Sequence, residues 1–241
     1  MVAQRGVYAN SSDTNELFAI SKSEGRFAMK YLVSIVVVIF LAGCSASEAY
    51  HAYYDIGLLQ VEHPADMKAR YGEQKITRIE EEGTYKYCFE DDIVKIIWIP
   101  TAYEFDFVLT NKSRYSIKII WDEAAFVDEN GLTHRIMHSG VRYIERDNPQ
   151  PPTVIPSGAT IADLIFPTDY VYWASGTYGG WRRLPLLPVS GATKEELSSK
   201  ATKYVGKTYK VLLPLTIEGV THEYVFTFKI IDVKVKNENS R

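Results

Sequence analysis

The sequence has few cysteines and no excess of positive charge. Only two cysteines occur in 241 residues, which excludes a disulfide-stapled small domain and a multi-cysteine metal domain. The formal net charge of -3 argues against a nucleic-acid binder that works by neutralising phosphates. An apolar fraction of 46% with 24% charged residues is normal for a folded chain and excludes wholesale disorder. We therefore expect a folded protein with a single core.

The chain also lacks the short motifs that mark common catalytic sites. It contains no Gly-x-Ser-x-Gly elbow, no phosphate-binding glycine loop and no His-Glu-x-x-His pattern. His134 and His138 have a spacing that chelates metals on a helix, but they fall on a predicted strand, where they would lie about 13 Å apart. Acidic clusters at 80–82 and 90–92 fall at predicted turns, where solvated side chains are expected. We predict no metal site, no cofactor and no enzymatic activity, with an envelope hydrolase that uses these acids as an alternative.

An export signal is the strongest feature of the sequence. Met29 and Lys30 precede an apolar run at 32–40, which ends in Leu41-Ala42-Gly43-Cys44. A short basic region, an apolar region of about 7–15 residues and a small-residue cleavage site make a secretory signal. A helix that crosses a membrane needs about 20 apolar residues, so a permanent span is the weaker interpretation.

The four residues that close this run resemble the lipobox of bacterial lipoproteins. The resemblance implies that cleavage falls between Gly43 and Cys44 and that Cys44 carries a diacylglyceryl thioether. Two or three acyl chains hold a protein durably on a membrane, so the expected partner is the membrane itself. Ser45 stands where an aspartate would retain the lipoprotein in the inner membrane. The resemblance therefore implies an outer-membrane position that faces the periplasm.

The signal divides the rest of the chain into segments. We predict that 1–28 is a start-site artefact, that 29–43 is the lipoprotein signal peptide and that 44–73 is a lipidated tether with a short helix at 48–60. A folded domain is expected over 74–236, followed by a tail at 237–241. Cys88 has no partner once Cys44 is lipidated, and we expect it to be a small buried hydrophobe.

From residue 74 the apolar residues recur with a period of two, which is typical of strands. The predicted strands are 74–80, 84–89, 93–99, 103–110, 116–121, 125–127, 133–137, 160–166, 208–217 and 221–235. A capping box at Thr193 predicts one short helix over 193–204. The lysines of the last strand, Lys229, Lys234 and Lys236, are expected on its solvated face. Many short strands with one helix favour an all-β fold built as an antiparallel two-sheet sandwich.

The segment 107–131 gives that fold a family resemblance. A strand that ends in Asn111 and Ser113, a second strand at 117–121 and a hairpin with Asp128 and Gly131 resemble the immunoglobulin-like domains of bacterial surface and periplasmic lipoproteins. The Cys–Trp–Cys spacing of antibody domains is absent. The resemblance implies an immunoglobulin-like β-sandwich without a disulfide between its sheets.

The most unusual stretch is 169–183, which mixes large aromatics, glycines and arginines. Loops on a rigid body commonly carry recognition, and Trp, Tyr and Arg are frequent in contacts with partners. The candidate binding residues are Tyr172, Trp173, Tyr178, Trp181, Arg182 and Arg183. The alternative is that Trp173 and Trp181 fold back as a lid over a sheet edge. A second loop at 146–156 is rich in proline and is expected to be extended.

Together these features predict a lipid-anchored protein of the bacterial cell envelope. Its expected role is non-catalytic binding or assembly, with the aromatic loop as the contact. Glycan recognition by the same loop is the alternative binding role.

The signal predicts the N-terminus of the mature protein that the cell makes. Intact-mass and N-terminal analysis should find a chain that begins at an acylated Cys44, because the signal peptidase releases everything before it. Cys44→Ser should abolish stable partition into membranes. Recovery of any peptide from 1–28, or equal membrane partition of the serine variant, would contradict the prediction.

Overall fold

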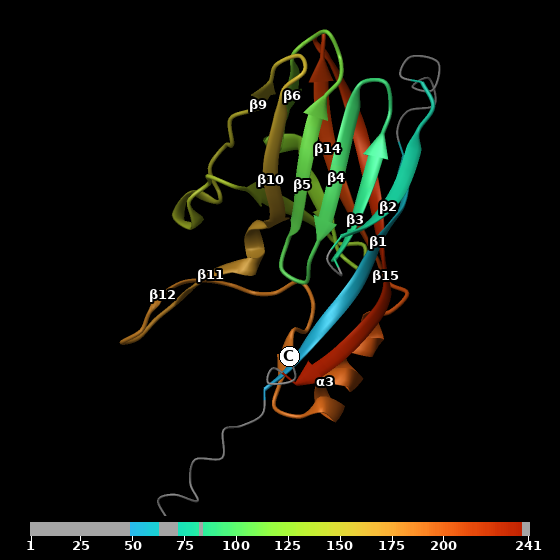
Figure 1. Ribbon diagram of the computed structural model, residues 1–241. Coiled ribbons are helices and arrows are strands. Elements are labelled where there is room, and N and C mark those ends of the chain that lie inside the picture. The colour runs from blue at the N-terminus through green and yellow to red at the C-terminus, as the bar shows by residue number, and fades with distance from the viewer. Residues whose placement is uncertain (1–48, 63–71, 82–83, 238–241) are drawn as a thin grey trace, which may run out of the picture. The chain divides into compact units, whose positions relative to one another are not determined.

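The computed structural model describes residues 49–62, 72–81 and 84–237, which form mostly antiparallel β-structure (Figure 1). The strands are β1 (Tyr50–Glu62), β2 (Lys75–Glu81), β3 (Thr84–Glu90), β4 (Val94–Pro100), β5 (Phe105–Asn111), β6 (Ile117–Ile119), β7 (Ala125–Val127), β8 (Thr133–His138), β9 (Thr153–Ile155), β10 (Thr160–Pro167), β11 (Val171–Ala174), β12 (Gly180–Arg183), β13 (Ser190–Gly191), β14 (Thr208–Ile217) and β15 (Val220–Asn237). The α-helix α3 spans Lys194–Ala201, and single 3-10 turns occupy Trp121–Glu123, Tyr143–Glu145, Thr168–Tyr170 and Thr202–Tyr204. None of the helices in these described ranges combines the length and apolar character needed to cross a bilayer.

Thirteen of the strands form one continuous hydrogen-bonded sheet that curls on itself. Its order is β13-β1-β15-β14-β7-β8-β10-β5-β4-β3-β2, with β6 and β9 branching from β14. The short strand β7 pairs with both β14 and β8. Because β7 and β8 join the two halves, the expected division into two separate ladders is not observed. The all-β class with one short helix is confirmed.

Aromatic side chains from the two halves of the sheet meet in the core. The ring of Trp98 on β4 lies 5.0 Å from that of Phe226 on β15, and Phe105 on β5 lies 4.8 Å from Phe228. All four side chains are buried. Tilted and edge-on ring pairs of this kind add to the gain from apolar burial. The core therefore holds the curled halves face to face.

The strand β15 lies between β14 and β1, and it runs beyond β14 while it stays paired with β1. The ladder with β14 ends at Thr208 opposite Lys229, whereas β1 pairs with β15 as far as Asn237. The helix α3 covers one face of this extension with Leu197 and Ala201, which pack on Ala52. We call the paired segments 50–55 and 232–237 the arm.

The short helix predicted at 48–60 is wrong, because residues 50–62 form β1. The folded domain therefore begins before the predicted boundary at residue 74. β1 pairs with the edge of β15 that faces away from β14, so the backbone groups on that edge have hydrogen-bond partners over 225–237. Two shifts of register in β1, after Asp55 and after Leu58, break the period of two that identified the other strands. The predicted helix at 193–204 is confirmed as α3 and the following turn, with Thr193 as its N-cap.

Asn111 fixes the turn that follows β5. It is fully buried, and its side-chain amide donates to the carbonyls of Tyr115, Ile155 and Pro156 at 2.7, 2.9 and 3.1 Å. Its Oδ1 accepts from the amide and the hydroxyl of Ser113 at 2.9 and 2.7 Å. Every hydrogen-bonding position of this amide is used, so the turn is held to the strand β9.

Asn111→Asp tests this network with almost no change in shape. The new carboxylate would face three carbonyl oxygens, so we expect a loss of about 3–5 kcal/mol in the free energy of unfolding at neutral pH. The loss should shrink as pH falls and the carboxyl group is protonated. Urea unfolding at pH 7 and pH 5 measures both effects. The exposed control Asn148→Asp should change the stability by less than about 1 kcal/mol, and equal effects of the two variants would contradict the role of Asn111.

Candidate functional site

The aromatic segment 169–183 forms a two-stranded hairpin that stands apart from the main sheet (Figure 1). The strands β11 and β12 pair in the register Tyr172 opposite Arg182 and Trp173 opposite Trp181. The two indole rings meet edge to face with centroids 5.6 Å apart. A cross-strand aromatic pair of this kind stabilises an otherwise marginal two-stranded hairpin. The expected loop is therefore a β-hairpin, and its glycines lie at the tip.

The tip requires glycine. The amide of Gly179 donates to the carbonyl of Gly176 at 2.8 Å, and a Cβ at Gly179 would lie 2.8 Å from the carbonyl oxygen of Ala174. Arg182 folds along the tip, where its guanidinium donates to the carbonyl of Tyr178 at 2.8 Å. The tip is thus a defined turn that presents the ring of Tyr178 to solvent.

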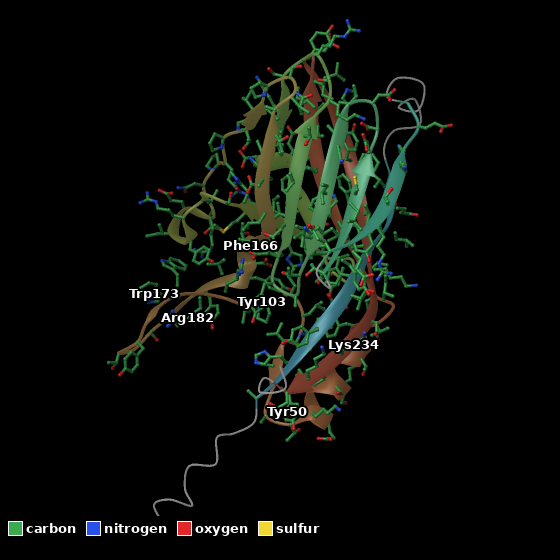
Figure 2. All side chains as sticks on the ribbon, viewed as in Figure 1. Tyr50, Tyr103, Phe166, Trp173, Arg182 and Lys234 are labelled. Carbon is green, nitrogen blue, oxygen red and sulfur yellow. The ribbon has the colours of Figure 1, made fainter. Side chains whose placement is uncertain are left out.

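Three of the candidate aromatics are exposed on the outer part of the hairpin. The exposed fractions are 44% for Tyr172, 60% for Trp173 and 88% for Tyr178. Figure 2 shows Trp173 and Arg182 on the projecting hairpin, with Phe166 and Tyr103 at its base. Single exposed apolar side chains are normal, but a group of large aromatics is a feature of contact surfaces. We call Tyr172, Trp173, Tyr178 and Arg182 the hairpin surface.

The other two candidates, Trp181 and Arg183, hold the hairpin to the body. Trp181 packs on the cluster of Met137, Phe166 and Val171, and the guanidinium of Arg146 lies 4.9 Å from the Trp181 ring centroid. Arg183 forms an ion pair with Glu104. The predicted set of six residues is therefore brought together in one hairpin but divides into exposed and supporting members.

A carboxylate with a raised pKa lies near the base of the hairpin. Burial raises the pKa of Asp106 to about 6; the neighbouring Glu104 also raises it, and Arg183 lowers it. Asp106 follows Phe105 on β5 and is half-buried. Sequence patterns do not identify this group, because its burial and its approach to Arg183 both depend on tertiary packing.

The histidines considered as metal ligands each have a carboxylate partner. His134 Nδ1 lies 2.7 Å from Asp169 and its Nε2 lies 3.5 Å from Asp128. His138 Nδ1 lies 3.2 Å from Asp163. Within 49–62, 72–81 and 84–237, no three His, Cys, Asp or Glu side chains are grouped to hold a metal ion.

Three described members of the acidic clusters considered for a hydrolase, Glu81, Glu90 and Asp91, are engaged in local contacts. Hydrogen bonds from Lys86 and Lys112 lower the pKa of Glu81 and Glu90, respectively. The buried Asp91 accepts from the amides of Ile93 and Val94 at 2.8 and 2.7 Å. The lowered pKa of Glu81 and of Glu90 is opposite in direction to the shift that a general acid needs.

The two predicted cysteine sites have different outcomes. Cys88 is buried on β3, as expected, and burial raises the pKa of its thiol. Gly43 and Cys44 lie outside the described residues, so lipidation stays a prediction.

A pocket that the sequence did not reveal lies between the arm and the end of the curled sheet. Its volume is about 450 Å³, and its lining includes Tyr53, Tyr54, Lys234 and Lys236. By sequence alone, the tyrosines fall in the predicted tether and the lysines on a predicted solvated strand face. Only the pairing of β1 with β15 brings them together.

Comparison with known proteins identifies no family for this chain. No protein-family model matches the chain, and no curated protein matches it. Among solved structures it is similar to a Northeast Structural Genomics Consortium target, SoR45, with 14% identity over 77% of this chain and 88% of that chain, and a TM-score of 0.23. A similarity at this level supports no inference about fold or function.

Asp106 makes stability depend on pH. Its pKa is about 6 in the folded chain and about 3.9 in the unfolded chain, so the folded state binds the proton more tightly. Its contribution is present below pH about 4 and is lost as pH rises through about 6. Asp106→Asn should therefore raise the free energy of unfolding by about 1 kcal/mol at pH 8, a value reduced for solvent screening, with no gain at pH 4.

Urea unfolding across this pH range measures the difference. A gain from Asp106→Asn that is equal at both ends of the range would show that Asp106 does not titrate in this window.

Proposed function

We propose that the chain is a lipid-anchored protein of the bacterial cell envelope that makes a non-catalytic contact with an envelope protein through the hairpin surface. We propose further that the curled sheet is a variant of the immunoglobulin-like β-sandwich in which β7 and β8 link the two halves, and that it serves as the rigid support. The signal at 29–43 and the lipobox at Cys44 support the location, and the outer membrane facing the periplasm is the expected side.

The observation that carries the proposal is the exposure of three large aromatic side chains within one short hairpin. Trp and Tyr provide large contact areas with few rotatable bonds, and Arg182 adds hydrogen-bond donors beside them. Trp181 and Arg183 fix the hairpin to the sheet, which lowers the entropy lost on binding. A hairpin built only to close a sheet edge would bury its rings instead.

Photo-crosslinking in intact cells tests this contact. A photoactivatable residue in place of Thr177 should give a discrete crosslinked species that mass spectrometry identifies as an envelope protein. Trp173→Ala with Tyr178→Ala should reduce its yield at least about tenfold, because such aromatic anchors commonly contribute most of the binding energy.

The matched control replaces Tyr115 and Leu132, which are 51% and 60% exposed, and should leave the yield unchanged. Equal yields from both double variants would remove the hairpin from consideration. If Trp173→Ala with Tyr178→Ala loses binding to purified peptidoglycan, and the parent gives no crosslinked protein, the hairpin surface would instead be assigned to a glycan.

A further inference from the structure

The arm presents cationic and aromatic side chains on one face. Antiparallel pairing sets Tyr53 opposite Lys234 and His51 opposite Lys236, so these side chains share a face of the two-stranded arm. The ammonium group of Lys236 lies 5.7 Å from the Tyr53 ring centroid. Tyr53 is 57% exposed and both lysines are exposed. The far end of the arm therefore combines positive charge with an exposed aromatic ring.

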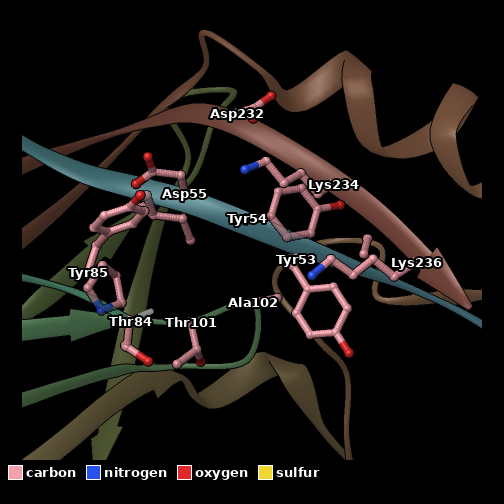
Figure 3. A pocket seen from close by; sticks show the side chains of 13 residues that line it. Tyr53, Tyr54, Asp55, Thr84, Tyr85, Thr101, Ala102, Asp232, Lys234 and Lys236 are labelled. Atoms are coloured by element: carbon pink, nitrogen blue, oxygen red, sulfur yellow. The ribbon is translucent and has the colours of Figure 1, made fainter. Parts of the chain in front are cut away.

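This face forms one wall of the pocket of about 450 Å³ (Figure 3). The lysine side chains reach toward it from β15, beside the rings of Tyr53 and Tyr54. Thr84 and Thr101 form the opposite wall. Such a pocket suits an anionic group of modest size that has an adjoining apolar or hydroxylated part.

The charges within the pocket place the anion at its outer end. Asp55 and Asp232 lie opposite each other toward the inner end. The carboxylate of Asp55 accepts hydrogen bonds from the Arg78 guanidinium at 3.0 Å and from the Tyr87 hydroxyl at 3.1 Å. Neither Lys234 nor Lys236 has a carboxylate within ion-pair distance in the described part of the chain. The two ammonium groups thus keep their charge available to a ligand.

The length of chain before β1 identifies the source of that ligand. Tyr50, the first residue of β1, is six positions after Cys44. Six residues span at most about 20 Å whatever their conformation. With the lipid of the proposed function on Cys44, the arm is held within that distance of the headgroup layer. Tyrosine is enriched at membrane interfaces, and each lysine near an anionic surface strengthens binding about fivefold.

We propose that Lys234 and Lys236, together with the ring of Tyr53, bind the phosphate headgroup of an anionic phospholipid in the membrane that carries Cys44. This inference rests on the proposed lipid anchor and adds a second contact to it. Because the tether confines the arm near the headgroups, even a weak site would be occupied. The arm would then lie at the membrane, and the end of the curled sheet opposite the arm would point away from the membrane.

Lysine footprinting of the full lipidated protein tests the contact. The protein is reconstituted in vesicles of phosphatidylcholine, with or without phosphatidylglycerol, and acetylation of each lysine is followed by mass spectrometry. Acetylation of Lys234 and Lys236 should slow at least about fivefold with phosphatidylglycerol, in line with the attraction expected for each. Lys118 pairs with Thr216, at the end of β14 and β15 that lies opposite the arm, and Lys75 pairs with Glu90, at the end of β3 away from the pocket. Both lysines are exposed and should be unaffected. Equal rates at Lys234 and Lys236 in both vesicles would overturn the proposal.

A charge-reversed variant separates specific contact from general attraction. A phosphatidylglycerol with a photoactivatable headgroup should crosslink to the arm, and Lys234→Glu with Lys236→Glu should lower the yield at least about fivefold. The matched control is Lys75→Glu with Lys118→Glu, which makes the same change of charge at the other end of the domain. An equal loss of yield in the control would show that only net charge matters and would overturn the site.

Two further measurements distinguish a failure of the proposed lipid anchor from a failure of the headgroup contact. Intact mass shows whether Cys44 is acylated: an unmodified cysteine defeats the proposed anchor, whereas an acylated protein without the lysine footprint defeats only this inference. Inorganic phosphate added in neutral detergent tests the alternative source. Protection of both lysines by free phosphate, with none from phosphatidylglycerol, would reassign the pocket to a soluble anion and overturn the lipid assignment.

Discussion

The feature on which the rest of the structure depends is that β15 is much longer than β14. Beyond Lys229 the strand loses its β14 partner on one edge, whereas its other edge stays paired with β1 along the whole extension. The backbone amides and carbonyls on that edge therefore keep their hydrogen-bond partners. One face of the resulting arm is covered by Leu197 and Ala201 of α3. The other face borders the pocket, so one length difference creates both the arm and its open side.

The two candidate contacts are built differently on this frame. The hairpin surface is attached through side chains, since Trp181 packs on the cluster around Met137 and Arg183 pairs with Glu104. The arm is attached through the backbone ladder of β1 and β15. Ladder hydrogen bonds fix register residue by residue, whereas a two-stranded hairpin is marginal by itself and depends on the side chains that pack at its base. Both candidate contact surfaces are therefore held in place, one by backbone pairing and the other by side-chain packing.

Local pattern predicted most of the sheet and failed where tertiary pairing decides. Strands with alternating burial, such as β5 and β15, were recognised because one face is apolar. The strand β1 was missed because its register shifts break the alternation. The composition of 169–183 singles out the hairpin segment, but β11 and β12 have only four residues each, which is too short for an alternating pattern to identify them as strands. Asp106 and the pocket depend on partners that are distant in sequence, such as Arg183 and the pair Tyr53 and Lys234, and no local pattern reports them.

The inclusion of β1 in the sheet changes what a lipid at Cys44 would do. A tether that reached residue 73 could extend to about 100 Å and would let the domain turn freely. With β1 beginning at Tyr50, six positions after Cys44, that reach falls to at most about 20 Å. Any shorter separation brings the charges on the arm toward the Debye length of about 8–10 Å at physiological salt, where they would act on the headgroups. A short tether therefore orients the domain as well as retaining it, and the end that meets the membrane is the one that carries Lys234 and Lys236.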